Sequence, residues 1–349
     1  MAFSLTSLSA LGDAPFDDVI DVRSPSEFAE DHLPGAISLP VLTDAQRAEV
    51  GTIYVRQDRF EARRIGAAHV SRNAADHLEG PLAGRRGGWR PLVYCWRGGM
   101  RSGSFATILT QIGWRADTLE GGYRAWRRLV SGALYDDALP LRVVLLDGNT
   151  GTAKTAILEA ASRLGVQTVD LEGLANHRGS VFGGMGPQPS QKMFEGRLAH
   201  RLAALDPNRP VLVEAESAKV GERFVPPSLW KAMRAAPRVR VEATLTTRAA
   251  YTARAYANVT ADGAALGGAL DALVPMQGRA QVEAWRAMAE EGRHEALAAE
   301  LMERHYDPRY ARSAIRDGVR PAHAVGLAGP HAADIEAAAR DVAALLARP

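Results

Sequence analysis

Short apolar runs along this chain alternate with segments of helical spacing, which predicts an α/β fold. Residues 91–94 and 142–146 are apolar runs of strand length. A glycine-containing loop follows each run and leads into apolar positions three or four residues apart, at Phe105, Ile108 and Leu109 in the first case and at Ile157, Leu158 and Ala161 in the second. Strand, loop and helix in this order build parallel sheets. We therefore expect two parallel-sheet halves, with a linker at 136–141.

The same patterning predicts the remaining elements. Strands are expected at 18–22, 166–171, 210–217 and 239–245, and helical segments at 246–258, at 275–303 and from 332 onward. Ser24-Pro25-Ser26-Glu27 is typical of a helix start, and Ser190 caps another helix. Arg56, Arg59, Arg63 and Arg64 are expected on one helix, either as a solvated face or as contacts to a phosphate backbone.

Length and composition indicate a two-domain globular protein. The 349 residues are 46% hydrophobic and 23% charged, and we place the domains at 1–135 and 136–349. A single cysteine excludes an intramolecular disulfide and a cysteine-based zinc site. Because no basic, apolar leader and no apolar run of membrane length is present, we expect a cytoplasmic protein without a membrane partner.

The only cysteine opens a loop with the features of a catalytic site. Cys95 directly follows the buried run, Gly98 and Gly99 permit a tight curl, and Arg97 and Arg101 add positive charge. A helix begins near Ser102 and ends at Gly113. The N-terminus of a helix favours anions, so the thiol should ionise readily. The alternative is that Cys95 is a small buried hydrophobic residue.

A second glycine loop predicts a phosphate-binding P-loop. It reads Gly148-Asn149-Thr150-Gly151-Thr152-Ala153-Lys154-Thr155 and connects a strand to a helix. Its backbone N–H groups would surround a di- or triphosphate, Lys154 would neutralise the charge, and the Thr155 hydroxyl is a candidate ligand for magnesium. Ala153 stands where the P-loop pattern has glycine, and we expect it to adopt right-handed torsions. The alternative is a structural glycine turn.

Further candidate residues follow the next two strands of this half. Parallel sheets bind ligands at the carboxyl ends of their strands. On this ground we select Asp170, Glu172, His177, Arg178, Glu214, Glu216 and Lys219. Alternation places Glu214 and Glu216 on one strand face, where they can hold a metal-bound water or polarise a reacting group. An exposed strand edge is the alternative interpretation of the two glutamates.

Several segments resemble one known family. Cys95-Trp-Arg-Gly-Gly-Met-Arg-Ser102 resembles the active-site loop of rhodanese domains, and residues 21–28, 32–37 and 118–126 are similar to other segments of that domain. Asp170-Leu-Glu-Gly-Leu-Ala-Asn-His-Arg-Gly-Ser180 resembles a segment diagnostic of tRNA 2-selenouridine synthases. Residues 214–221 and 305–310 resemble two further motifs of that family, with Ala215 replacing a serine.

The resemblance implies a rhodanese-like domain followed by a P-loop NTPase-like domain with a helical C-terminal part. It also implies that selenium replaces sulfur at the wobble 2-thiouridine of tRNA, with selenophosphate as donor and an S-geranylated intermediate made from geranyl diphosphate. Cys95, Arg97 and Arg101 would then be catalytic. The implied partners are tRNA, these two anions and an enzyme that produces selenophosphate. No cofactor is implied with certainty, and magnesium stays open.

Two other functions fit the same residues. The spacing of Cys95 and Arg101 resembles phosphatases of the Cys-x5-Arg type, so a phosphatase or sulfurtransferase fused to a P-loop kinase-like domain is one alternative. The other is a non-catalytic adaptor that senses nucleotides.

Overall fold

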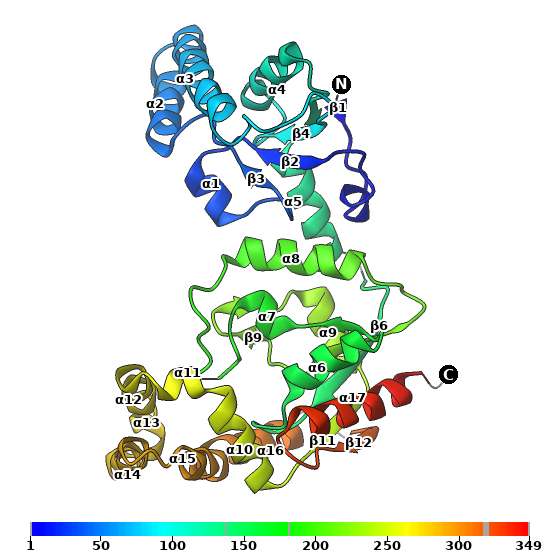
Figure 1. Cartoon of the computed structure of the whole chain (residues 1–349), viewed down its shortest axis with the longest axis vertical. Helices are drawn as coiled ribbons and strands as arrows, with labels where there is room; N and C mark the ends of the chain where they lie inside the picture. Colours follow the sequence, from blue (N-terminus) through cyan, green and yellow to red (C-terminus); the bar gives the residue numbers. More distant parts are fainter. Residues whose placement is uncertain (1, 137, 181, 317–320, 348–349) are drawn as a thin grey trace. The chain divides into compact units, whose positions relative to one another are not determined.

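The computed structural model describes residues 2–136, 138–180, 182–316 and 321–347, and the chain divides into two units (Figure 1). The first comprises residues 1–138 and 189–204, and the second comprises 139–188 and 205–349. The predicted boundary after residue 135 therefore lies three residues before the observed division. Helix α8 (Gln191–Ala203) packs with the first unit, although its sequence position lies in the second predicted domain.

The first unit is built on a five-stranded sheet in which all neighbouring strands run parallel. Its order is β1-β5-β4-β2-β3. The strands are β1 (Ala2–Phe3), β2 (Asp18–Asp21), β3 (Ile37–Ser38), β4 (Pro91–Tyr94) and β5 (Asp117–Leu119). The helices are α1 (Pro25–Glu30), α2 (Asp44–Arg56), α3 (Arg59–Glu79), α4 (Met100–Ile112) and α5 (Tyr123–Ser131), with a 3-10 turn at Ser9–Leu11 and a π turn at Gly132–Asp136.

Local signals explain most boundaries in this unit. The Ser24 capping box precedes α1 as predicted, and Gly113 ends α4 with a φ of 107°. The prediction of one helix for the arginine series was wrong. Asp58 interrupts it in extended conformation, and its carboxylate accepts the N–H of Glu61 at 2.6 Å to start α3.

The second unit also has a five-stranded parallel sheet, with the order β12-β11-β6-β8-β7. The strands are β6 (Arg142–Asp147), β7 (Gln167–Val169), β8 (Pro210–Glu214), β11 (Arg238–Glu242) and β12 (His323–Gly326), and an antiparallel pair is formed by β9 (Lys219–Val220) and β10 (Arg223–Phe224). The helices are α6 (Lys154–Arg163), α7 (Leu171–Ala175), α9 (Pro227–Ala235), α10 (Leu245–Ala255), α11 (Ala257–Thr260), α12 (Gly263–Asp271), α13 (Val274–Gln277), α14 (Arg279–Glu290), α15 (His294–Leu301), α16 (Asp307–Arg316) and α17 (Ala332–Leu346), with a π turn at Met302–Tyr306.

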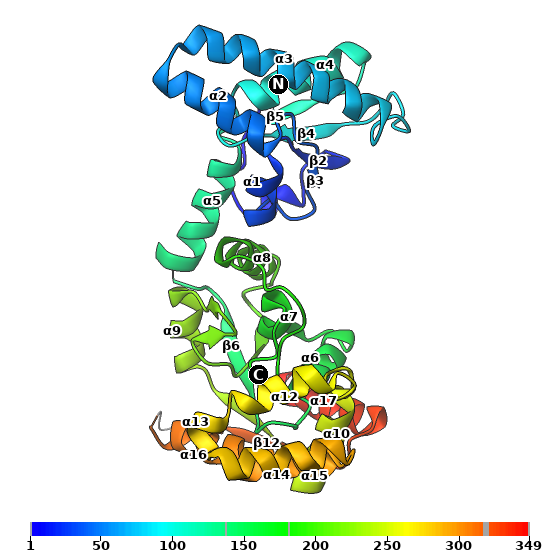
Figure 2. The same ribbon diagram turned by 90° about the vertical axis from the view of Figure 1, so that its left-hand side faces the viewer.

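Helices α12 to α16 gather at one end of this unit (Figure 2), which agrees with the predicted helical C-terminal part. Three expected strands end early. β7 stops at Val169 because Asp170 caps α7 by accepting the N–H of Gly173 at 2.7 Å. β8 stops at Glu214, and β11 stops at Glu242 before α10 begins at Leu245. The elements of this unit that were not predicted are α7, α9, α12 and α16 and the strands β9, β10 and β12.

Within the described ranges, no helix combines the length and the apolar character needed to cross a membrane.

Candidate functional site

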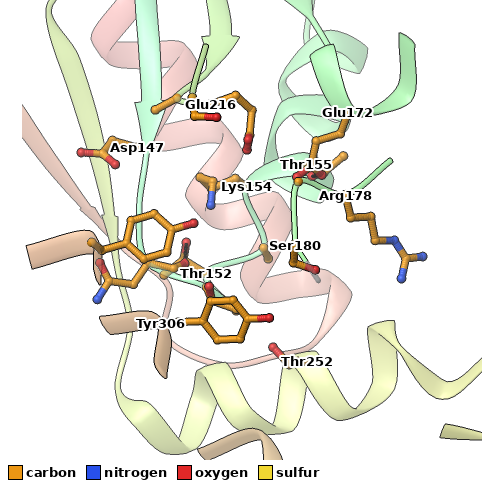
Figure 3. Close-up of a pocket in the computed structure, with 18 of the residues that line it drawn as sticks. Asp147, Thr152, Lys154, Thr155, Glu172, Arg178, Ser180, Glu216, Thr252 and Tyr306 are labelled. Carbon is orange, nitrogen blue, oxygen red and sulfur yellow. Dashed lines mark hydrogen bonds between the residues drawn. The ribbon is translucent and has the colours of Figure 1, made fainter. Parts of the chain in front are cut away.

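A cavity of about 1560 Å³ lies at the carboxyl edge of the second sheet (Figure 3). The P-loop lines one part of it, and the segments that follow β7 and β8 line another. Side chains from α10 and from the start of α16 complete its wall. Parallel sheets bind ligands at this edge, so the cavity is the principal candidate site of the second unit.

Lys154 lies centrally among the side chains drawn in Figure 3, with Thr155 next to it in α6 and Glu216 on a neighbouring segment. Its ammonium group donates to the carbonyl oxygen of Gly148 at 3.0 Å. Burial by itself lowers the pKa of this amine, but Tyr310, Glu216 and nearby glutamates outweigh burial and raise the pKa above its usual value. Lys154 therefore stays charged at neutral pH, as phosphate binding requires.

The P-loop backbone has the geometry of an anion site. The first hydrogen bond of α6 joins the N–H of Ile157 to the carbonyl of Ala153 at 2.9 Å, so the N–H groups of residues 154–156 have no acceptor inside the helix. Gly151 has a φ of 85°, and a Cβ there would lie 2.7 Å from the carbonyl oxygen of Arg248. Only glycine fits at that point.

Ala153 contradicts our expectation of right-handed torsions. Its φ of 56° and ψ of 31° are left-handed, and it occupies the N-cap of α6. Left-handed torsions cost a residue with a Cβ about 1–2 kcal/mol relative to glycine. The glycine of the P-loop pattern would carry no such penalty, so Ala153 is a strained position beside the phosphate site.

Two predicted phosphate-binding side chains instead hold the loop together. The amide of Asn149 donates to Asp307 Oδ1 at 3.0 Å, and its oxygen accepts from Arg240 at 2.8 Å. The Thr152 hydroxyl, which is buried, donates to the carbonyl oxygen of Asn149 at 2.9 Å. These residues can contribute backbone N–H groups to an anion, while their side chains are already engaged.

Three glutamates lie beside Lys154 and Thr155. The Thr155 hydroxyl donates to Glu172 Oε2 at 3.0 Å, and the N–H of Glu172 lies 3.5 Å from Glu214 Oε2. Glu214 is 1% exposed on a central strand, so the alternative of an exposed strand edge was wrong. Burial, followed by repulsion from Glu172, raises the pKa of Glu214 well above its usual range and that of Glu216 to about 7.

The described residues contain no group of three or more histidine, cysteine, aspartate or glutamate side chains arranged to hold a metal ion. The chemistry of the donors nevertheless suits magnesium, because Thr155 and Glu172 present neighbouring oxygens and magnesium is often bound by one or two carboxylates together with substrate phosphates. Burial is the largest cause that raises the pKa values of Glu172 and Glu216, and a bound cation would favour their ionised forms.

The other second-unit candidates divide into two groups. Arg178 lines the cavity, donates to the carbonyl of Ala255 at 2.9 Å and stacks over Tyr256 at 4.8 Å. Lys219 also lines the cavity but pairs with Glu222 at 3.2 Å. Asp170, which also lines the cavity, caps α7, and His177 Nδ1 accepts the N–H of Gly179 at 3.0 Å. The latter two residues thus stabilise local structure.

Four tyrosines line the cavity together with the P-loop, and they were only partly predicted. Tyr306 and Tyr310 lie in a motif recognised in the sequence, whereas Tyr251 and Tyr256 come from α10 and its end. The Tyr256 hydroxyl lies 3.3 Å from the Ser180 hydroxyl. The cavity therefore combines a phosphate-binding end with a surface suited to an apolar or aromatic group.

In the first unit, Cys95 lies between the hydrophobic core and polar donors. It is 4% exposed and belongs to the same buried cluster as Val93 and Phe105. Its Sγ accepts from the N–H of Gly99 at 3.3 Å and from the Ser102 hydroxyl at 3.2 Å. Burial raises the pKa of the thiol, but Ser102, Arg101 and backbone N–H groups outweigh burial and lower the pKa overall. These donors favour a thiolate, as predicted.

The two loop arginines differ in their availability. Arg97 is exposed at the loop surface. Arg101 donates to Glu27 Oε2 at 2.8 Å, so its guanidinium has a carboxylate partner that the sequence did not reveal. The loop also packs against the start of α5, where a Cβ at Gly122 would lie 2.3 Å from the carbonyl oxygen of Cys95. That close approach requires glycine.

Comparison with known proteins identifies a domain family for each half of the chain. Residues 4–129 match the family model of the rhodanese-like domain, and residues 141–281 match that of the tRNA 2-selenouridine synthase AAA domain. A tRNA 2-selenouridine synthase from Aeromonas salmonicida is 35% identical over 326 residues, which cover 84% of this chain and 87% of that protein.

Two further relatives bear the same name. The protein from Nitrosomonas europaea is 37% identical over 235 residues, 66% of this chain and 61% of the relative, and that from Hahella chejuensis is 37% identical over 250 residues, 68% and 63%. In these two comparisons the chain spans about three fifths of the relative's length. The near full-length match to the Aeromonas protein, together with both domain matches, shows that the chain belongs to the tRNA 2-selenouridine synthase family.

Proposed function

We propose that this protein is a tRNA 2-selenouridine synthase that replaces sulfur by selenium at the wobble 2-thiouridine of tRNA. Selenophosphate is the selenium donor, and geranyl diphosphate supplies an S-geranyl group that makes the C2 sulfur a better leaving group. The observation that carries the proposal is the charged Lys154 in a cavity of about 1560 Å³ that four tyrosines also line. Such a cavity suits a ligand with an anionic head and an apolar chain.

Geranyl transfer is assigned to the second unit. The N–H groups at the start of α6 and the Lys154 ammonium bind the diphosphate, while Tyr256 and Tyr306 contact the geranyl chain. The C2 sulfur of thiouridine attacks C1 of the geranyl group, the C1–O bond breaks with its electron pair leaving on the diphosphate, and the N3 proton of the base is released to solvent. Lys154 stabilises that developing charge. Magnesium held by Thr155 and Glu172 would supply further positive charge to the diphosphate.

Selenium transfer is assigned to the first unit. The Ser102 hydroxyl and the Gly99 N–H hold the Cys95 sulfur as a thiolate, and Arg97 is available at the loop surface for an anionic donor. At the nucleoside, the selenium of selenophosphate attacks C2, and the C2–S bond breaks with geranyl thiol as the leaving group. Water then cleaves the Se–P bond, which releases phosphate and leaves selenium at C2. Arg101 assists through its charge while it remains paired with Glu27.

Separating the two steps tests this division. Lys154→Ala should lose most geranyl transfer to thiolated tRNA, whereas Cys95→Ala should retain geranyl transfer and lose selenation. Lys231→Ala, at an exposed lysine of α9, is the matched control and should behave as wild type. Mass spectrometry of tRNA nucleosides measures both products. Equal loss of both steps in Cys95→Ala, or normal geranylation by Lys154→Ala, would refute the assignment.

A further inference from the structure

The turn between α2 and α3 exposes an apolar cluster that the fold does not use. Tyr54, Val55 and Phe60 are 45%, 81% and 74% exposed, and all three lie within residues 54–60. Single exposed apolar residues are common, but three adjoining ones on a surface turn point to a binding role. We refer to residues 54–64 as the hairpin tip.

Helices α2 and α3 form a helical hairpin, and its packing explains why the side chains of the tip are exposed. Helix α2 has no buried residue, and α3 buries only Ala62, Val70 and Ala74. Val70 and Ala74 belong to the core of the first unit and lie in the later half of α3. Figure 2 shows the turn on the side of the hairpin away from β4 and β5. The exposed side chains therefore contribute little to folding.

The charges at the tip are arranged for an anionic partner. Of its four arginines, Arg64 pairs with Glu61 at 2.5 Å, and Arg59 lies 5.5 Å from the ring centre of Tyr54. The Asp58 carboxylate is engaged as the cap of α3. Among the described residues, Arg56 and Arg63 form no ion pair with a carboxylate. Positive charge at the tip is thus left unneutralised next to exposed aromatic rings.

We propose that the hairpin tip binds a single-stranded segment of the tRNA substrate. Exposed rings stack on unpaired bases, and nearby arginines contact the phosphates on either side. An acidic protein would satisfy the arginines alone, whereas RNA also provides flat bases for Tyr54 and Phe60. This inference rests on the proposed function for the identity of the RNA, and it adds a binding surface remote in sequence from Cys95 and from the P-loop.

Equilibrium binding of purified thiolated tRNA to the full chain tests the inference. Phe60→Ala should weaken binding about tenfold, which lies within the range that stacking on one base commonly contributes. Phe60→Trp should retain wild-type affinity, since it keeps the ring. Log affinity falls as log salt rises. The double variant Arg56→Gln, Arg63→Gln should make this fall less steep by roughly 1.4 in slope, about 0.7 for each lost phosphate contact.

Ile112→Ala and Arg115→Glu are the controls, because both residues are exposed on the first unit outside the tip. Neither should change affinity. Unchanged tRNA affinity and an unchanged salt slope in the tip variants would overturn the inference. The same result is expected if the tip binds a protein instead of RNA. Binding is measured without turnover, so absence of selenation by the wild type would refute the proposed function while leaving the tip result readable.

Discussion

Arg248 and Asp307 form a bidentate ion pair, and both residues also hydrogen-bond to the P-loop. The guanidinium donates to Oδ1 and Oδ2 of Asp307 at 2.8 and 2.6 Å and also to the carbonyl oxygen of Thr150 at 3.2 Å. Asp307 accepts in addition from the side chain of Asn149. The phosphate-binding loop is thereby connected to α10 and to the start of α16.

Asp307→Asn should therefore loosen the P-loop. The Arg248 side chain is 7% exposed, so loss of its partner should lower the free energy of unfolding by about 2 kcal/mol, below the full effect for a buried pair because Asp307 is 27% exposed. Diphosphate binding should weaken as well. Urea unfolding and calorimetric titration with diphosphate measure the two effects. Asp271→Asn breaks an exposed pair and should change stability by less than about 0.5 kcal/mol; equal effects would contradict the prediction.

Ser102→Ala should make Cys95 less reactive. The variant removes a hydrogen bond of 3.2 Å to Sγ and so raises the pKa of the thiol. Alkylation by iodoacetamide at neutral pH should slow on the order of tenfold, because a hydrogen bond to a charged group contributes about 1.5 kcal/mol. Ser104→Ala, on the exposed side of α4, provides the comparison. If both variants react like wild type, Ser102 does not stabilise the thiolate.

Glu216 should give the second unit a distinctive pH dependence. Its folded-state pKa of about 7 exceeds the usual 4.5, so between these values the folded state keeps a proton that the unfolded chain has lost. The stability that this group contributes is complete below about pH 4.5 and is lost as the pH rises from there through 7, by about 3 kcal/mol in total. The free energy of unfolding of Glu216→Gln, measured by urea unfolding at a series of pH values, should decline less as the pH rises. Glu222→Gln, at a side chain that is 73% exposed, should retain the full decline.

Ala153→Gly should relieve backbone strain. The left-handed torsions of Ala153 cost about 1–2 kcal/mol, partly offset by the greater entropy of glycine in the unfolded chain, so the net stabilisation should be up to about 1 kcal/mol. Ala156 is the third residue of α6. Ala156→Gly should instead destabilise the protein by about 1 kcal/mol. Thermal unfolding of both variants checks the contrast. A loss of stability in Ala153→Gly would mean that the left-handed conformation carries no strain.

Much of the architecture could be predicted because its signals are local. The Ser24 capping box, the Gly113 helix end and the apolar runs of β4 and β6 each depend on a few adjacent residues. The same is true of the strand, loop and helix sequences around Cys95 and Lys154. The failures were also local in cause, since Asp58 and Asp170 act as helix caps within segments that otherwise appear continuous.

The sequence by itself therefore determined where the two glycine loops lie, which reactive group each carries and that each precedes a helix. Only the tertiary structure decided what surrounds them. Asn149 meets Asp307 across 158 positions, and Arg101 meets Glu27 across 74. Neither pairing has a local pattern, because it depends on how strands and helices pack. The raised pKa values of Glu214 and Glu216 have the same origin, since burial and the proximity of other charges exist only in the folded chain.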